Sequence, residues 1–357
     1  MNTRGCRNEV ARLTLVPRIT VEVKQTTNQI NAMLLMYHQM LHLFILILIL
    51  NNAIASADWD YGKHGPDVWK KNYVACGGKN QSPINIRTKC TISQTFSRFE
   101  LTSIYYEPVK FKLTNNGHTI TAVPNSPTPI SLTGGNLKGR YIFDSFHLHW
   151  GPNDNSGSEH QVNGDKSAGE SHFVYHHAET DQRAVLSFLM ETEDSTRHQV
   201  YPRNRSKAVA MEQQWQTYFD TARHLMEENS SATVDLTLNL LMGSNLAEFW
   251  RYEGSLTTPS CKENVFWTVF RQPILILNYD FEAFRDDLFF ESYRGPQPLY
   301  HRQVYRSFLN EKLSPIPDEN VCINKSEAGL FFDIFHQTTI CVLHFSFLAF
   351  YRLFYLN

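Results

Sequence analysis

The sequence predicts a sheet-dominated α+β domain that occupies the middle of the chain. From residue 58 to about residue 308, short runs of β-branched and aromatic residues alternate with turn residues, and there is no internal repeat or low-complexity linker. The strongest helical segment is 206–228. The expected strands are 109–113, 119–123, 141–150, 172–176, 184–190, 234–241, 265–270 and 274–277.

The length of 357 residues at first suggests two or more domains, but neither end has the pattern of a globular protein. A content of 42% hydrophobic, 13% aromatic and 19% charged residues excludes an intrinsically disordered chain. The formal net charge is −2, and there is no basic run or stripe, so we expect no nucleic-acid partner. We therefore expect one large domain, 58–308, between two processed ends.

The N-terminal segment 1–57 has the pattern of an extension followed by a secretory signal peptide. An unbroken apolar run at 43–50 precedes the small residues Ala55, Ser56 and Ala57, which predicts cleavage before Asp58. The basic residues of this segment lie upstream of Met33, so Met33 is a possible start of translation. The alternative is an uncleaved anchor, although the apolar run is shorter than the ~20 residues that span a bilayer.

The C-terminal end predicts a stalk at 309–326 and a hydrophobic signal at 327–357. Small and polar residues precede an apolar terminus, as in signals for attachment of a GPI anchor at the cell surface. A membrane-spanning helix and a buried terminal helix remain as alternatives. Asn204, Asn229 and Asn324 each begin an Asn-X-Ser glycosylation triplet, which agrees with an exported chain.

Histidines are concentrated between residues 118 and 177. His147 and His149 alternate with apolar residues, and on a strand their side chains share one face, whereas on a helix they would diverge. A neighbouring strand could supply His172, with Glu170 on the same face to fix a ligand's tautomer. Three neutral imidazoles with one open position are a catalytic zinc arrangement. The alternative is that these histidines are ordinary buried residues bonded to the backbone.

Several spaced motifs between Trp59 and about Arg306 closely resemble the α-class carbonic anhydrases. They are QSPINI at 81–86, NNGH at 115–118, FHLHWG at 146–151, GSEH at 157–160, ESH at 170–172, SLTTP at 255–259 and QPL at 297–299. The resemblance implies a large, mostly antiparallel twisted sheet with few peripheral helices and a conical cleft that ends at Zn²⁺. It also implies reversible hydration of CO2 to bicarbonate and a proton.

The resemblance assigns roles to individual residues. His147, His149 and His172 match the zinc ligands, and Thr257 with Glu159 matches the pair that orients the attacking hydroxide. His118 matches a proton shuttle. The remaining matched positions are Tyr61 and Asn115 in the connecting water network, Val174, Val185, Leu256 and Trp267 on the apolar wall for CO2, Thr258 beside Thr257, and Glu170 and His160 behind the ligands.

Three positions depart from the family pattern without removing a ligand. Ser145 stands where the family usually has Gln, and it is too short to make the same contact with His147, so a loss near the lower end of ~10–100-fold in metal affinity or activity is expected unless water bridges the gap. Thr121 replaces a common Asn or Gln on the cleft wall. Tyr175 stands where His is frequent.

The six cysteines divide by position. Cys76 and Cys261 match the disulfide of secreted and membrane-bound family members, which requires an oxidising compartment. Cys90 and Cys322 are candidates for a second bridge, for which the sequence gives no geometric evidence. The last two, Cys6 and Cys341, lie in the ends that we expect to be removed.

The sequence thus predicts an extracellular, lipid-anchored zinc carbonate dehydratase with CO2 and bicarbonate as its small-molecule partners. A non-catalytic binding or adhesion module on the same fold is the first alternative, although such relatives have typically lost ligand histidines. A zinc esterase is the second, and it is more plausible as a side activity. The oligomeric state stays open.

Overall fold

The structure is a computed structural model that describes residues 33–42, 59–192, 205–243, 245–287 and 291–309, together with residues 313 and 322. The chain divides into two compact units, Met1–Asp58 and Trp59–Asn357. In the first unit, the described residues 33–42 form a helix. None of the helices within these ranges combines the length and the apolar character needed to cross a bilayer.

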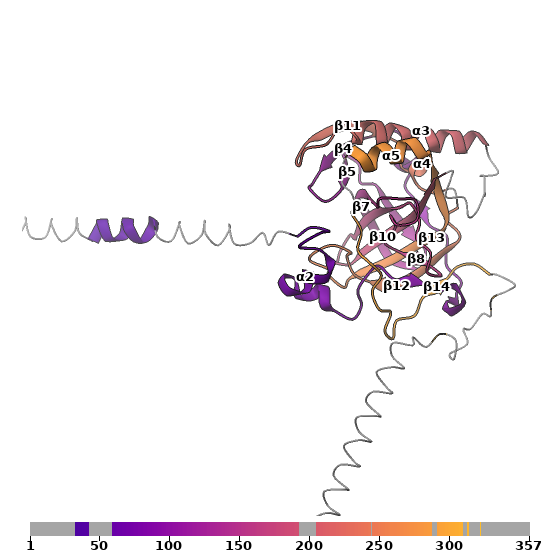
Figure 1. Ribbon diagram of the computed structural model, residues 1–357, viewed down its shortest axis with the longest axis horizontal. Coiled ribbons are helices and arrows are strands. Elements are labelled where there is room, and N and C mark those ends of the chain that lie inside the picture. The colour runs from indigo at the N-terminus through magenta and orange to yellow at the C-terminus, as the bar shows by residue number, and fades with distance from the viewer. Residues whose placement is uncertain are drawn as a thin grey trace, which may run out of the picture. The chain divides into compact units, whose positions relative to one another are not determined.

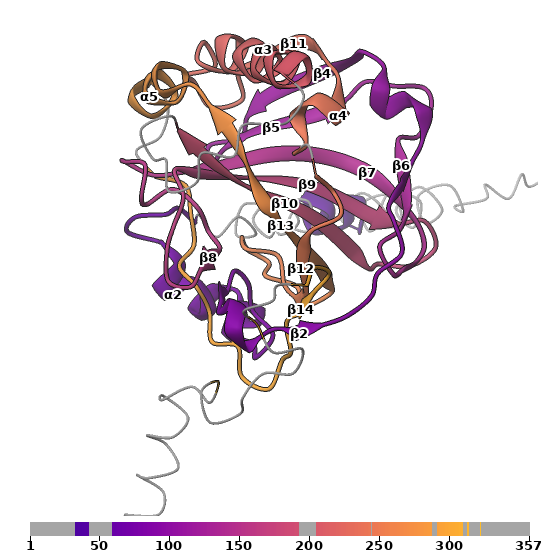
Figure 2. The same cartoon turned by 90° about the vertical axis from the view of Figure 1, so that its right-hand side faces the viewer.

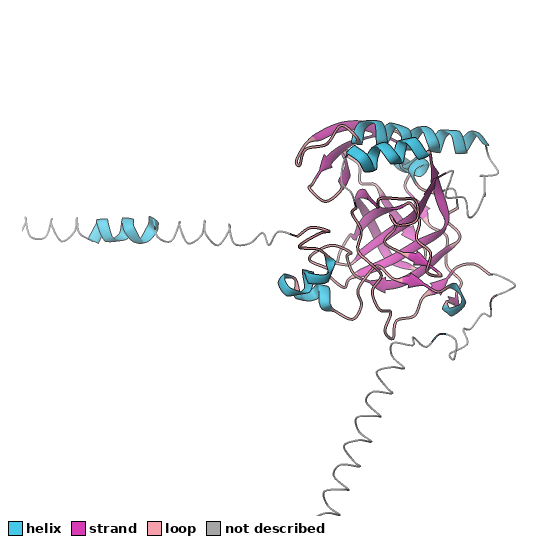
Figure 3. Cartoon of the chain, in the orientation of Figure 1, coloured by secondary structure: helices cyan, strands magenta, loops and turns pink. Residues whose placement is uncertain are grey.

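A sheet dominates the second unit (Figure 1, Figure 3). In the described part of the chain, 12 strands join in the order β11-β4-β5-β7-β9-β10-β13-β12-β14-β2, with β6 paired to β7 and β3 to β6. The strands are β1 Asn85–Ile86, β2 Ile92–Ser93, β3 Glu100–Leu101, β4 Val109–Asn115, β5 Ile120–Pro124, β6 Ser131–Gly134, β7 Leu137–Trp150, β8 Gln161–Val162, β9 Gly169–His177, β10 Arg183–Thr192, β11 Ser231–Leu236, β12 Phe249–Gly254, β13 Val265–Ile276 and β14 Tyr305–Arg306.

Most neighbouring strands are antiparallel, as expected, but β14 and β2 pair in parallel, and so do β10 and β13. A parallel pair needs a crossover connection, and here α3, β11, α4 and β12 intervene in the chain. The helices are α2 Pro66–Asn72, α3 Arg205–Ala222, α4 Leu238–Leu241 and α5 Asn278–Asp287, with 3₁₀ turns η1 Val74–Gly77, η2 Thr88–Cys90 and η3 Ser103–Tyr106. The fold is therefore sheet-dominated α+β, which confirms the predicted class.

The central strands bury one face against α3 and α5, which lie along one side of the sheet in both views (Figure 1, Figure 2). Phe146 and Leu148 of β7 belong to this core, together with Trp215 and Phe219 of α3. Alternation along a strand then turns the residues between them to the other face. A second, smaller core on that other face includes Val185 and Trp267.

The sequence was misleading at the end of one expected strand. The segment 234–241 was expected to be extended throughout, but β11 ends at Leu236 and α4 follows. Leu238 and Leu241 are both fully buried. Their spacing of three residues places them on one helical face, so a helical turn buries both leucines together.

Two disulfides connect distant parts of the second unit. Cys76 bonds to Cys261, as the family resemblance implies, and Cys90 bonds to Cys322, which confirms the candidate second bridge. Cys322 lies in the predicted stalk, so the described part of that segment is covalently attached to η2. Most of the predicted leader and C-terminal signal lies outside the described residues.

Candidate metal centre

Strand β7 presents His147 and His149 on one face of the sheet. Phe146 and Leu148 alternate with them and are fully buried in the core on the opposite face. His172 of β9 stands directly across from His147 in the strand register. The structure therefore brings together the three histidines that the sequence predicts.

These three side chains form a group that could hold a metal ion. One ring nitrogen from each lies within 4.8 Å of the others. Burial lowers the pKa of all three imidazoles, that of His149 to about 4, so they are neutral ligands at physiological pH. Nε2 of His149 is buried and has no hydrogen-bond partner among the described residues. Three neutral nitrogens, one of which has no other partner among the described residues, fit a zinc ion.

The other ring nitrogens of two ligands have protein partners. Nδ1 of His149 lies 2.5 Å from the backbone oxygen of Ser292. Nε2 of His172 lies 2.7 Å from Oε1 of Glu170. Such bonds fix the tautomer and the ring orientation of a ligand. In contrast, the His147 ring has no hydrogen-bond partner within the described part of the chain, and neighbouring Ser145 does not supply one.

Glu170 is the centre of a buried hydrogen-bond network. Its Oε1 lies 2.6 Å from Nδ1 of His160 and accepts a bond of 2.5 Å from Oγ of Ser187, and its Oε2 accepts the His160 N–H at 2.7 Å. Burial opposes the charge, but interactions with His160 and His172 outweigh burial and hold the pKa of Glu170 well below its usual range. Glu170 is thus an anionic support behind His172.

Glu159 is buried beside two of the three imidazoles, and its Oε2 lies 3.9 Å from Nδ1 of His172. Its Oε2 is 3.5 Å from Nε2 of His149 and is buried without a hydrogen-bond partner among the described residues. Its Oε1 accepts the backbone N–H of Arg294 at 2.8 Å, and Thr257 hydrogen-bonds to the same carboxyl group. Burial raises the pKa of Glu159 to about 7, against the opposing charge interaction with His172.

The apolar residues that the sequence assigned to a substrate wall form one row across three strands. Val174 of β9 pairs with Val185 of β10, which pairs with Trp267 of β13. Val174 and Leu256 pack against the same small core as Val185 and Trp267. Thr258 lies in the loop after β12, where its backbone oxygen accepts the N–H of Cys261 at 2.7 Å.

His118 lies in the turn between β4 and β5, as the Asn-Gly hairpin signal predicted. Gly117 has a φ of +82°, which favours glycine, and Asn116 Oδ1 accepts the N–H groups of His118 and Thr119 at 3.0 and 2.9 Å. The His118 ring stacks on Trp59, with ring centres 3.6 Å apart. Burial and the charge of Glu159 raise the pKa of Tyr61 well above its usual value.

Asn115 does not have the surroundings expected of a residue in a water network. It is 1% exposed, its Nδ2 donates to the backbone oxygen of Leu225 at 2.8 Å, and its Oδ1 accepts the N–H of Gly117 at 2.9 Å. Its amide therefore holds the turn. The neighbouring Asn116 is exposed, and its Nδ2 lies 3.2 Å from Oγ1 of Thr121.

Sequence reasoning missed several supporting residues. Ser292 acts through a backbone oxygen, for which no side-chain signal exists, and Ser187 looks like an ordinary strand residue. Tyr252 could have been noticed as a buried polar group: its hydroxyl lies 2.7 Å from Nε2 of His160. Arg294 positions Glu159 with its backbone and donates through its guanidinium to Gln81 at 2.8 Å.

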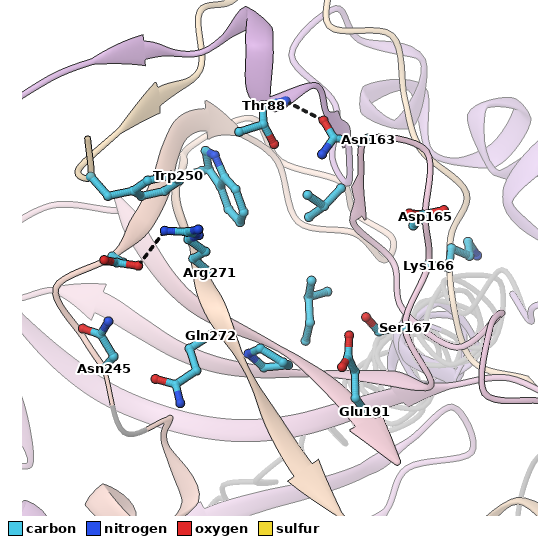
Figure 4. A pocket seen from close by; sticks show the side chains of 15 residues that line it. Thr88, Asn163, Asp165, Lys166, Ser167, Glu191, Asn245, Trp250, Arg271 and Gln272 are labelled. Atoms are coloured by element: carbon cyan, nitrogen blue, oxygen red, sulfur yellow. Dashed lines mark hydrogen bonds and ion pairs between the residues drawn. The ribbon is translucent and has the colours of Figure 1, made fainter. Parts of the chain in front are cut away.

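A separate cavity of about 550 Å³ lies away from the three histidines. Figure 4 shows Thr88 and Asn163 at one side of this cavity, joined by a bond of 2.8 Å, and Trp250 and Arg271 at another. None of the residues predicted for the metal centre lines it. The cavity is therefore distinct from the metal centre.

Three imidazoles on one face of a sheet, with a buried carboxyl group beside them, are a candidate metal site. Comparison with known proteins identifies the family: the model for eukaryotic-type carbonic anhydrases matches residues 64–308. Carbonic anhydrase 4 of Oryctolagus cuniculus is 31% identical over 281 residues, covering 72% of this chain and 84% of that protein. Carbonic anhydrase 6 of Homo sapiens is 30% identical over 297 residues, covering 76% and 90%. The chain belongs to the carbonic anhydrase family.

Proposed function

We propose that this protein catalyses zinc-dependent, reversible hydration of CO2 to bicarbonate and a proton at the cell surface. The observation that carries the proposal is the group of His147, His149 and His172, with Glu159 beside it. Family membership supports the same reaction.

His147, His149 and His172 would hold the zinc ion through one neutral nitrogen each. When bound, zinc lowers the pKa of a coordinated water to about 7, an effect for which carbonic anhydrase is itself the standard example, and so supplies a hydroxide nucleophile near neutral pH. Glu170 and the Ser292 carbonyl keep two of the imidazoles in the orientation that binding requires.

Thr257 and Glu159 would orient the nucleophile. A bound dication would favour the carboxylate form of Glu159 and so counter the effect of burial on its pKa. The Thr257 hydroxyl donates its single proton to that carboxylate, and its oxygen then acts only as an acceptor toward the reacting oxygen. This arrangement directs a lone pair of the nucleophile toward carbon, which is a positioning effect.

The row of Val174, Val185 and Trp267, with Leu256, would hold CO2 beside the nucleophile. CO2 has no net charge and accepts only weak hydrogen bonds, so apolar contacts suit it better than a polar surface does. His118 would then carry the released proton to solvent, because an imidazole has an ordinary pKa near 6.5 and exchanges protons readily near neutral pH.

We also propose that the protein is exported and attached to the outer surface of the membrane by a lipid. Two disulfides are typical of an oxidising compartment. Asn229, which begins a glycosylation triplet, is exposed. Release of the protein from cells by phosphatidylinositol-specific phospholipase C is the expected result, whereas retention in the membrane would indicate a spanning helix.

The catalytic proposal is tested by stopped-flow CO2 hydration together with zinc stoichiometry. We expect about one zinc per chain and hydration that a chelator abolishes. A protein without zinc, or hydration no faster than in buffer, would contradict the proposal and favour a binding or adhesion module. Hydrolysis of activated esters without CO2 hydration would instead favour an esterase.

The shuttle role has its own test. His118→Ala should slow turnover in weak buffer, and added imidazole should partly restore it, because an external base can replace the missing ring. His64→Ala is the control, since His64 is an exposed histidine that pairs with Asp60 and has no assigned place in the proton route. Equal rates for the two variants would remove His118 from the proton route.

A further inference from the structure

The face of the sheet that carries the metal ligands changes character along β9 and β10. Successive cross-strand pairs on this face are His172 with Ser187, Val174 with Val185, and His176 with Arg183. At about 3.3 Å per residue, His176 lies about 13 Å along the strand from His172. The apolar wall is therefore one pair deep on these two strands, and a polar pair follows it.

A bulge in β7 adds a carboxylate to that polar pair. The register shifts between Phe143 and Ser145, so Asp144 is an extra residue on β7. Bulges often redirect a side chain. Oδ1 of Asp144 lies 2.5 Å from Nδ1 of His176, and Oδ2 accepts a bond of 3.0 Å from Nη1 of Arg183. The side chain of Asp144 is 31% exposed, that of His176 41% and that of Arg183 39%, so ligands can reach them.

We propose that Asp144, His176 and Arg183 form a charged rim that ends the apolar wall and determines which molecules the cleft accepts. The inference rests on the proposed metal centre. A molecule as small as CO2 fits on the wall formed by Val174 and Val185 without touching the rim. A longer apolar group would have to cover the rim and remove water from an ion pair.

Two physical effects give the rim its selectivity. Covering charged groups with an apolar chain removes their hydration without replacing it, which opposes binding. Arg183 carries five N–H donors, and Asp144 accepts one of them at 3.0 Å, so donors remain for an anionic group. The rim should therefore disfavour apolar extensions and favour carboxylate extensions, and Asp144 should limit the second preference by its own negative charge.

The experiment measures dissociation constants by calorimetry for the zinc-loaded full-length protein. The probes are benzenesulfonamide, its para-butyl derivative and its para-carboxylate derivative, and each substituted compound is expressed as a ratio to benzenesulfonamide. The variants are Arg183→Leu and Asp144→Asn. The matched control is Arg271→Leu, because Arg271 forms a similarly exposed ion pair with Glu248 at 2.9 Å on the distinct cavity.

In Arg183→Leu, we expect the ratio to move about threefold to fivefold in favour of the butyl probe and by a similar factor against the carboxylate probe. Asp144→Asn should move the carboxylate ratio in the opposite direction, which a general loosening of the cleft would not do. Ratios that change equally in Arg183→Leu and Arg271→Leu would overturn the rim alone. Failure of the wild-type protein to bind benzenesulfonamide would overturn the metal centre and the rim together.

Discussion

Two of the three candidate metal ligands have a hydrogen-bond partner at the ring nitrogen that faces away from the metal site, and the third does not. Nδ1 of His149 is bonded to the Ser292 carbonyl and Nε2 of His172 to Glu170, whereas the His147 ring has no hydrogen-bond partner among the described residues. All three histidines come from adjacent central strands. The sheet therefore sets the positions of the ligands, but other parts of the chain set the orientations of their rings.

This difference predicts that the three imidazole rings are not equally ordered before metal binds. A bond to the remote ring nitrogen fixes the tautomer and reduces the rotamer freedom that metal binding would otherwise remove. His149 and His172 are 1% exposed, but His147 is only partly buried. We infer that His147 is the least ordered ligand before metal binds.

The largest effect should follow from removal of one of the two hydrogen-bonded ligands. His149→Ala should abolish stoichiometric zinc binding and reduce CO2 hydration by roughly 1000-fold or more, because the nucleophile depends on the metal. Metal analysis and stopped-flow hydration measure the two quantities. His177→Ala, on the same sheet but away from the ligand group, should retain both, and equal losses in the two variants would contradict the assignment.

The next effect should come from the support behind His172. Glu170→Ala should weaken zinc affinity by about 10–100-fold, since it removes the acceptor at Nε2 and leaves buried donors of His160 and Ser187 without their partner. Competition with a chromophoric chelator gives the affinity. Glu107→Ala removes an exposed carboxylate and should leave the affinity unchanged. A normal affinity in Glu170→Ala would show that the sheet alone orients His172.

The sequence could predict the ligand positions because alternation along a strand is visible in residues 146–150. It could also predict the apolar row, because Val174, Val185 and Trp267 match family positions. It could not predict the Ser292 contact, which joins residues 143 positions apart through a backbone oxygen that every residue possesses. The parallel pairing of β10 with β13 was hidden for a related reason, since propensity does not specify which distant strand is the partner.

Asn115 shows that a motif match does not predict how deeply a residue is buried. A motif match assigned it a place in a water network, but the burial that decides its role depends on packing against Leu225, 110 residues away. Asp144 shows the same limit for the rim, because the register shift in β7 becomes visible only when β9 is placed beside it.

A smaller effect should follow from giving His147 the support that it lacks. Ser145→Gln extends the side chain that shares the cleft face with His147, and its amide oxygen could accept the remote N–H of the ring. We expect zinc affinity to rise by up to about 10-fold, the lower end of the range for such supports. Chelator competition measures the change. Ser145→Ala should have no effect; a loss in that variant would indicate that the serine already acts through a bridging water.

The smallest effect should come from Ser187, which acts on a ligand only through Glu170. Its hydroxyl donates to the same Oε1 that faces Nε2 of His172, so its loss should make that oxygen a stronger acceptor for the imidazole while removing one constraint on the carboxylate. Because these two consequences oppose each other, Ser187→Ala should change zinc affinity by only about twofold to threefold, less than the loss of one hydrogen bond to a charged group would suggest.

Ser171→Ala is the matched control, because Ser171 is buried like Ser187 and lies next to His172 in β9, but it donates to the backbone oxygen of Phe188 at 3.5 Å. If Ser187→Ala lowers zinc affinity as much as Glu170→Ala does, the serine is an essential part of the support and not a modulator of it. His172 would then depend on a strand residue of β10 as much as on the carboxylate beside it.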